Sequence, residues 1–169
     1  ARADAVLQYR RSIPLDLGDA SPVPVVGFED RHADGLRRLW QTEVSVVRGI
    51  DHADVVLRRQ KDSPGHEEIL VVESPEGEVV AACSVRIRSI TADGPSLGEI
   101  AVLAVDRHHR GRGLARGLLR SAQDVLERSD TKTAAVFVGE ADLPAQEFLA
   151  HHGFRRRRAI PTYGVGDDS

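Results

Sequence analysis

The chain has 169 residues, of which 41% are hydrophobic, and carries a formal net charge of −3. This length and composition suffice for one well-buried core, and the slight acidity excludes a general attraction to nucleic acid or to an anionic membrane. No apolar stretch approaches the roughly 18 residues of a membrane span, and the start has no signal-peptide pattern. The single cysteine, Cys83, excludes an intramolecular disulfide, as is typical of the reducing cytoplasm, where we expect the protein to lie.

Strand and helix patterns alternate before the glycine-rich segment of the chain. Runs rich in β-branched residues predict strands, whereas apolar residues at spacings of three and four predict helices. Turn residues, SPEG and TADGPS, separate the last three strands of this half, which are therefore expected to be antiparallel. In chain order, the predicted elements are a strand at 23–28, helices at about 30–47 and 53–60, and strands at 67–74, 78–90 and 97–105.

Three further elements and two flanking segments complete the expected organisation. A long helix follows Gly113, a strand covers 133–138, a helix capped by Asp142 ends at Gly153, and a last strand covers 154–160. We divide the chain into an N-terminal arm, a single domain and an acidic tail, at 1–21, 22–162 and 163–169. The arm is either a linker remnant or a segment that packs on the partner subunit of a homodimer.

The segment VDRHHRGRGLARGLLRSA at 105–122 places three glycines and five arginines where a strand meets a helix. Glycine lets the backbone approach a ligand and arginine suits an anion, so this segment predicts phosphate binding. A phosphate-binding NTPase loop needs Lys and then Ser or Thr after its last glycine, whereas Gly113 precedes Leu114. A dinucleotide-binding turn needs a small residue at position 116, which is arginine, and lies in an early parallel unit.

What this segment fits is an arginine followed by x-x-Gly-x-Ala at the start of a helix, with its backbone N–H groups turned toward a pyrophosphate. A tight turn with solvated arginines is the alternative. Here LGEIAVLAVDRHHRGRGLARGLL resembles the acyl-CoA-binding motif of the GNAT superfamily of N-acyltransferases. The later segment LPAQEFLAHHGFRRRR resembles a second motif of that family, a helix that ends in Gly-Phe. The resemblance covers about residues 22–162.

The resemblance implies a mixed α/β (α+β) fold of three layers, with helices on both faces of a mainly antiparallel sheet. The sheet is splayed between the fourth and fifth predicted strands, where the pantetheine of acetyl-CoA lies. Backbone groups of Leu103, Ala104 and Val105 are expected to pair with the pantetheine amides. The residues expected to hold the pyrophosphate are Arg110, Gly111, Arg112, Gly113, Leu114 and Ala115.

The activity implied is transfer of an acetyl group from acetyl-CoA to a primary amine of a small molecule, by direct attack in a ternary complex. Acetylation of a protein lysine or N-terminus, and acyl-CoA binding without catalysis, are the alternatives. Glu99 is the candidate base, because it lies eleven residues before Arg110, the offset at which several GNAT members carry theirs. Strand alternation predicts that Glu99 shares a face with Ala101, Leu103 and Val105. A solvated Glu99, or one paired with Arg86 or Arg88, is the structural alternative.

The acid that protonates the departing thiolate is harder to assign. The tyrosine that the family usually has four residues before Gly-Phe is replaced by Leu149. Tyr163, a histidine or water is the substitute, or the thiolate leaves unassisted, since a thiol pKa is about 8.5. No metal is expected, because the histidine pairs at 108–109 and 151–152 lack further ligands. Cys83 as an acylated nucleophile is disfavoured, since nothing places a base beside it.

Overall fold

The computed structural model describes residues 5–18, 23–43, 52–63, 65–89, 96–140 and 142–161. Its strands are β1 (Ala5–Ser12), β2 (Val25–Gly27), β3 (Glu67–Glu73), β4 (Val79–Ser89), β5 (Ser96–Val105), β6 (Thr133–Gly139) and β7 (Arg155–Pro161). Its α-helices are α1 (Ala33–Glu43), α2 (His52–Asp62), α3 (Leu114–Arg128) and α4 (Leu143–His151).

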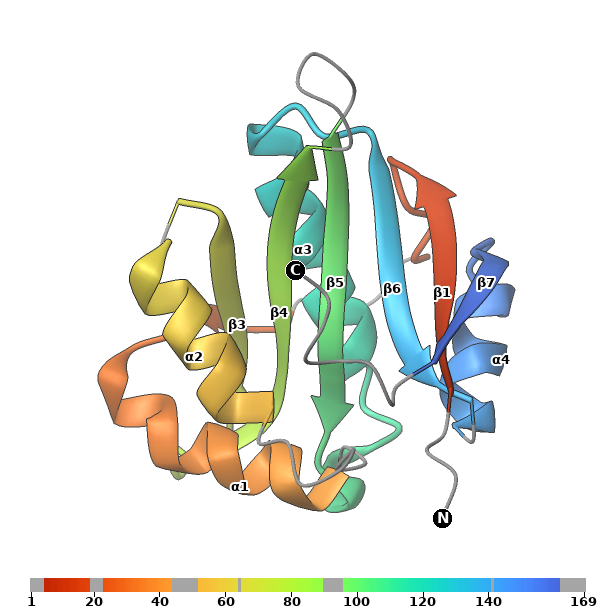
Figure 1. Ribbon diagram of the computed structural model, residues 1–169. Helices are drawn as coiled ribbons and strands as arrows, with labels where there is room; N and C mark the ends of the chain where they lie inside the picture. Colours follow the sequence, from red (N-terminus) through yellow and green to blue (C-terminus); the bar gives the residue numbers. More distant parts are fainter. Residues whose placement is uncertain are drawn as a thin grey trace.

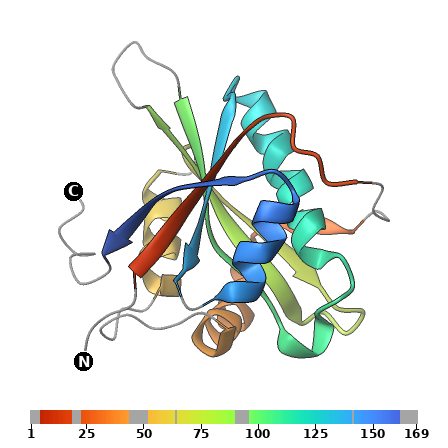
Figure 2. The ribbon, with the colours of Figure 1, turned by 90° about the vertical axis from the view of Figure 1, so that its right-hand side faces the viewer.

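One sheet forms the middle layer, with the strand order β2-β3-β4-β5-β6-β1-β7 (Figure 1). Only β5 and β6 run parallel, and every other neighbouring pair is antiparallel. Viewed from the β7 edge, α2 lies on one side of the sheet and α3 and α4 lie on the other (Figure 2). The mixed, mainly antiparallel sheet with helices on both faces is therefore confirmed.

Two apolar cores, one on each face, follow the predicted helical spacing. On the first face, Leu36, Leu39 and Trp40 of α1 are buried against strands β3, β4 and β5, together with apolar residues of α2. On the second, α3 buries Leu118, Leu119, Ala122, Val125 and Leu126. Burial of these stripes fixes both helices on the sheet, since each apolar side chain removed from water contributes about 1.5–3 kcal/mol. The predicted extension of the first helix to 47 lies outside the described residues.

The N-terminal segment differs from its expected form. Residues assigned to a separate arm form strand β1, which lies between β6 and β7 and pairs with both. The strand is anchored because Leu7 and Tyr9 point into the core shared with α3 and α4, while Gln8 on the opposite face is 2% exposed and accepts a hydrogen bond from Arg10. These side chains alternate as a strand requires. Ala5–Ser12 is thus part of the central layer rather than a linker.

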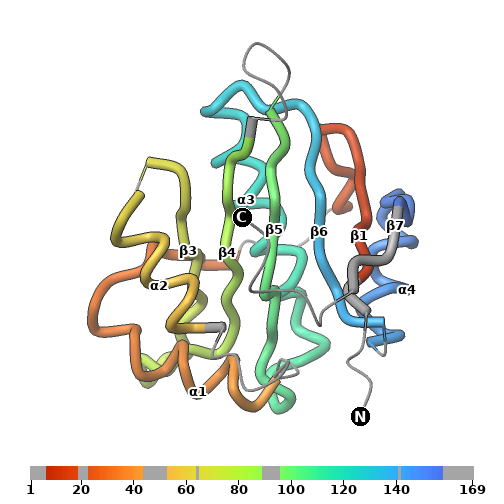
Figure 3. The backbone as a smooth tube through the Cα atoms, in the orientation of Figure 1, coloured from red at the N-terminus to blue at the C-terminus, as the bar shows by residue number. Residues whose placement is uncertain are grey.

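Strands β5 and β6 pair over only part of their length and then diverge. Their ladder joins Gly98–Ile100 to Ala134–Val136, and the traces diverge beyond it (Figure 3). Because β1 adds a strand at the start of the chain, this is the splay expected between the fourth and fifth predicted strands. We call the stretch of β5 at 101–105, which faces the divergence, the open edge. Among the described residues, no strand pairs with the open edge on its β6 side.

A bulge in β5 changes which side chains share a face. Ala101 pairs with Ser84 and Ala104 pairs with Ala82, so two residues of β5 lie opposite one residue of β4. Val102 takes the extra place with a φ of 53°. Glu99 therefore shares a face with Ala101, as expected, but the bulge carries Leu103 and Val105 to the other face, against the core of α3. The predicted four-residue alternation is wrong beyond Ala101 for this reason.

Candidate active site

The open edge ends beside the glycine-rich turn that starts α3. Leu103, Ala104 and Val105 lie on the open edge, and Ala104 is buried. Their other backbone edge is hydrogen-bonded to β4, where Val105 lies opposite Ala81. Three of the predicted cofactor residues therefore combine a fixed backbone with one edge that has no strand partner in the described chain. Such an edge can pair with the amides of an extended ligand.

The turn itself has the geometry that its glycines suggest. Gly111 and Gly113 have φ values of 81° and 77°, which are left-handed conformations that favour glycine. Gly113 is the residue that precedes the first turn of α3, and it caps that turn with no side chain. Leu114 and Ala115 begin the helix, whose first turn contains no acidic residue. The helix N-terminus therefore presents backbone N–H groups and partial positive charge without a carboxylate of its own.

The arginines of the turn behave differently from one another. Arg110 donates a hydrogen bond of 2.7 Å from Nη2 to Oε1 of Glu43, the last residue of α1. Arg107 donates to the other oxygen of the same carboxylate, whose side chain is only 3% exposed. Arg112 is exposed. Sequence reasoning missed Glu43, because nothing in the order of elements shows that the end of α1 meets the glycine-rich turn.

Glu99 is the middle residue of the three-residue ladder between β5 and β6. It pairs with Ala135 of β6 on one side and with Arg86 of β4 on the other. Its side chain is 13% exposed, and its Oε2 lies 3.6 Å from Nη1 of Arg88. The carboxylate is thus largely buried but keeps some contact with solvent. Its ion pair with Arg88 is one of the two arginine pairings that the sequence had offered.

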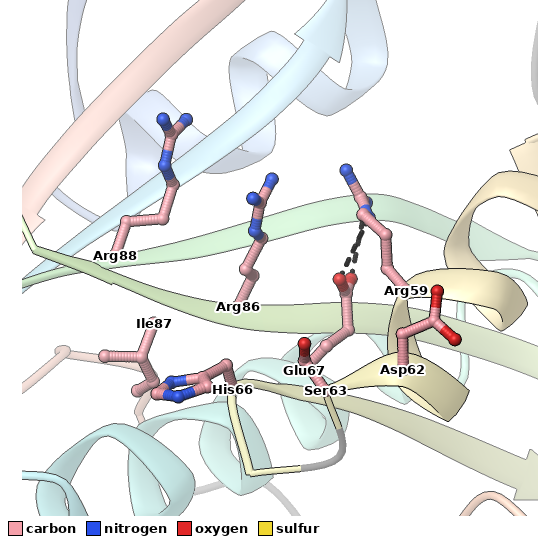
Figure 4. A pocket seen from close by; sticks show the side chains of 8 residues that line it. All are labelled: Arg59, Asp62, Ser63, His66, Glu67, Arg86, Ile87 and Arg88. Atoms are coloured by element: carbon pink, nitrogen blue, oxygen red, sulfur yellow. Dashed lines mark hydrogen bonds and ion pairs between the residues drawn. The ribbon is translucent and has the colours of Figure 1, made fainter. Parts of the chain in front are cut away.

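A cavity of about 470 Å³ lies between the start of β3, the end of β4 and the end of α2 (Figure 4). Arg86 and Arg88, the cross-strand neighbour and the ion-pair partner of Glu99, are part of its lining. Its residues are polar apart from one isoleucine. They are Arg59, Asp62, Ser63, His66, Glu67, Arg86, Ile87 and Arg88. The sequence indicated Arg86 and Arg88 only as possible partners of Glu99, and it gave no signal for Arg59. The signal available was the alternation of arginine with Val85 and Ile87 along β4.

The remaining candidates lie away from this region or outside the described chain. Tyr163 is among the residues that the structure does not describe. Leu149 is buried in the core beneath α4, with 1% of its surface exposed. Complete burial raises the pKa of the Cys83 thiol to about 12, so this thiol stays protonated at neutral pH and is no nucleophile.

The histidine pairs take structural roles. His109 Nδ1 lies 2.7 Å from Asp106 Oδ2, and this contact lowers the pKa of the Asp106 carboxyl. His152 Nδ1 lies 2.9 Å from the backbone oxygen of Asp16. In the described part of the chain, no group of three or more His, Cys, Asp and Glu side chains is arranged to hold a metal ion. The same part contains no helix that is long and apolar enough to span a membrane.

A comparison of the sequence with known protein families gives a result that agrees with the turn, the open edge and the strand order. Residues 33–154 match the acetyltransferase (GNAT) family model. The chain belongs to this family. GNAT acetyltransferases take the acetyl group that they transfer from acetyl-CoA.

Individual GNAT proteins are similar to the chain over most of its length. The mycothiol acetyltransferase of Acidimicrobium ferrooxidans is 28% identical in an alignment of 162 residues, which covers 90% of this chain and 52% of that protein. The chain thus spans about half the length of this curated relative. The solved glucosamine-6-phosphate N-acetyltransferase of Arabidopsis thaliana superposes with a TM-score of 0.65 at 16% identity, covering 80% of this chain and 92% of that one.

A ribosomal-protein-alanine N-acetyltransferase from Brucella melitensis is another solved GNAT structure of this kind. It superposes with a TM-score of 0.63 at 18% identity, covering 76% of this chain and 90% of that chain. At this level of identity, the likeness to both solved structures establishes the fold. The residues of the site therefore have to indicate the acceptor.

Proposed function

We propose that the protein transfers an acetyl group from acetyl-CoA to a primary amine of a small molecule, by direct attack in a ternary complex. The observation that carries this proposal is that the open edge ends beside the N-terminus of α3, which begins after Gly113 and has no side-chain cap. The backbone edge at Leu103–Val105, which has no strand partner in the described chain, suits the pantetheine amides, and the turn at Arg110–Ala115 suits the pyrophosphate. On this edge the carbonyl oxygen of Val105 accepts a hydrogen bond of 3.4 Å from Nε of Arg110. An extended ligand with an anionic centre would bind to the backbone edge and to the turn at the same time.

Glu99 is the residue that we propose as the base. An amine with a pKa of about 10 is protonated at neutral pH and has no lone pair with which to attack a thioester. The carboxylate of Glu99, two residues before the open edge begins, would accept that proton. The contact with Arg88 supports this role because it orients the carboxylate. The Glu99 side chain is 13% exposed, so the carboxylate is not fully buried by this contact. The amine lone pair then attacks the thioester carbonyl, and the thiolate of CoA leaves.

A small acceptor is favoured over a lysine-rich peptide by the charge of the adjacent cavity. Three arginines line it against two carboxylates, Asp62 and Glu67. A binding groove for a protein lysine is expected to be acidic, since a cationic chain is repelled by exposed guanidinium groups. Acyl-CoA binding without catalysis is the second alternative, and the ion pair between Glu99 and Arg88 is the observation in its favour.

A screen of amines distinguishes these functions. Purified protein is mixed with acetyl-CoA and, one at a time, with small primary amines, lysine-containing peptides and peptides with free N-termini, and release of the CoA thiol is followed. We expect release with small amines and no release with peptides. Peptide acetylation alone would support the protein-directed alternative. If acetyl-CoA raises the melting temperature while no amine releases thiol, the chain binds acyl-CoA without catalysis.

Tyr163 stays the proposed acid for the departing thiolate. Replacement of Tyr163 with Phe removes the hydroxyl while keeping the ring, so we expect turnover to fall and the affinity for acetyl-CoA to stay unchanged. The effect should be moderate, about tenfold to a hundredfold, because a thiolate is a tolerable leaving group near neutral pH. Steady-state kinetics with the best amine of the screen measure it. Wild-type turnover in Tyr163→Phe would mean that the thiolate leaves unassisted or with help from elsewhere.

A further inference from the structure

Charged residues of three neighbouring strands form one row across the sheet. Arg86 of β4 lies opposite Glu67 of β3 on one side and opposite Glu99 of β5 on the other. Residues paired in this way have Cβ atoms about 4.5–5.5 Å apart and project from the same face. This is the face covered by α2, because Arg59 of α2 reaches Glu67. The row therefore places one guanidinium between two carboxylates.

Each of the two carboxylates has another arginine as its partner. Glu67 is 2% exposed, its Oε1 lies 3.0 Å from Nε of Arg59, and it also accepts a hydrogen bond from the hydroxyl of Ser84. Glu99 contacts Arg88 at 3.6 Å. By contrast, none of the ion pairs or side-chain hydrogen bonds among the described residues involves Arg86. Arg86 is therefore the arginine of the row whose charge has no partner in the described chain.

The cavity between β3, β4 and α2 gives Arg86 room to bind a ligand. Arg59, Arg86 and Arg88 extend to the same side of the sheet, and the Arg59 guanidinium is tied back to Glu67 (Figure 4). The cavity of about 470 Å³ is lined by all three. A planar guanidinium with free N–H groups binds carboxylate or phosphate oxygens in pairs. The geometry thus offers an anion site one residue across the sheet from the proposed base.

We propose that Arg86 binds an anionic group, a carboxylate or a phosphate, carried by the acceptor amine, while Glu99 faces the ammonium group of the same molecule. This proposal rests on the proposed function and narrows its acceptor to a small zwitterion. The two protein groups are direct cross-strand neighbours, so both charges of the acceptor belong to one small molecule, such as an amino acid or an amino sugar phosphate. Opposite charges set side by side also orient the amine toward the open edge.

The kinetic test uses matched pairs of acceptors that differ only in the anionic group. Glucosamine 6-phosphate is compared with glucosamine, and an α-amino acid with its amide, in the wild type and in Arg86→Gln. We expect the wild type to prefer the anionic member, and the substitution to raise its KM by about tenfold to a hundredfold with little change for the neutral member. The preferred pair distinguishes phosphate from carboxylate. Arg38→Gln, which removes an exposed arginine of α1 outside the cavity, is the control and should keep the preference.

A second arm needs no turnover. In ¹⁵N-labelled protein, the Nε–Hε signal of Arg86 is assigned by its loss in Arg86→Gln and is followed during titration with inorganic phosphate and, separately, with acetate. We expect the Arg86 signal to shift with at least one anion. In Arg86→Gln, the Arg88 signal should report an apparent affinity for that anion about tenfold lower than in the wild type or in Arg38→Gln.

The two arms separate failure of this proposal from failure of the proposed function. Equal rates for anionic and neutral amines, or a preference that survives Arg86→Gln, would overturn the proposal while leaving amine acetylation intact. If no amine is acetylated, the proposed function fails, and the titration still decides whether Arg86 forms an anion site. An Arg86 signal that neither anion moves would overturn the proposal on its own.

Discussion

Acetyl-CoA is expected to raise the melting temperature of the wild type, and Gly113→Leu is expected to abolish this rise. A ligand at a hundredfold excess over its dissociation constant stabilises a protein by about 2.7 kcal/mol, which for a chain of this size corresponds to about 5 to 10 °C. A leucine side chain at the start of α3 would stand where the pyrophosphate approaches the backbone N–H groups. Thermal melts with and without acetyl-CoA measure the difference, and NAD and ATP should have far smaller effects.

The control for this substitution is Gly77→Leu. Gly77 lies in the turn between β3 and β4 and has a φ of 86°, so a leucine there bears the same left-handed backbone cost as at Gly113, where φ is 77°. A Cβ at either position has no heavy atom closer than 3.6 Å outside its chain neighbours. Both variants should therefore melt somewhat lower than the wild type, and only Gly77→Leu should keep the full response. An undiminished response in Gly113→Leu would remove the turn from the cofactor site.

The substitution Glu99→Gln should lower turnover by about a hundredfold to ten-thousandfold and leave acetyl-CoA binding unchanged. The amide keeps the shape of the side chain but cannot accept a proton, and general base catalysis contributes rate factors of this size. Turnover with the best amine is measured across neutral and alkaline pH. We expect the loss of turnover in the variant to be largest at neutral pH, where the amine is protonated, and to shrink at alkaline pH, where the free amine needs no base. The acetyl-CoA melting shift confirms that the variant is folded.

Glu68→Gln is the matched control for Glu99→Gln. Glu68 lies on β3 and contacts Arg128 at 3.6 Å, the same separation as between Glu99 and Arg88. Its side chain projects from the face of the sheet opposite the row of Glu67, Arg86 and Glu99, since it pairs with Val85. Both substitutions thus remove one carboxylate from an equally long arginine contact, and only the one at Glu99 should affect turnover. Similar rates and pH profiles for both variants would clear Glu99 of the role.

Sequence patterns predicted those parts of the fold that depend on local residue order. The spacing of Leu36, Leu39 and Trp40 gave the buried face of α1, and Asp142 caps α4 by accepting a hydrogen bond from the N–H of Ala145. The place of β1 could not be read in this way. Its alternation of Leu7 and Tyr9 with polar residues is short, and its two neighbours come from the other end of the described chain. Such pairing depends on which sheet edge is free, and chain order does not show that.

The sequence signals for the proposed cofactor site are stronger than those for the proposed acceptor site. Glycines at 111 and 113 indicate a turn because few other residues adopt a positive φ. Val102 also has a positive φ, yet a β-branched residue gives no such signal, so the bulge and its change of face stayed hidden. Arg86 became informative only when the register set it between two carboxylates that already had partners.

The position of β1 has a consequence for the order in which the domain can assemble. β6 and β7 are not neighbours in the sheet, and β1 joins them. Synthesis makes residues 5–12 long before 133–161, so this strand has to wait for both of its partners. Contacts between such distant segments slow folding, because a long loop must close before any pairing is gained. Until that closure, β7 lacks its partner strand, and β6 is held to the rest of the sheet only by its three-residue ladder with β5.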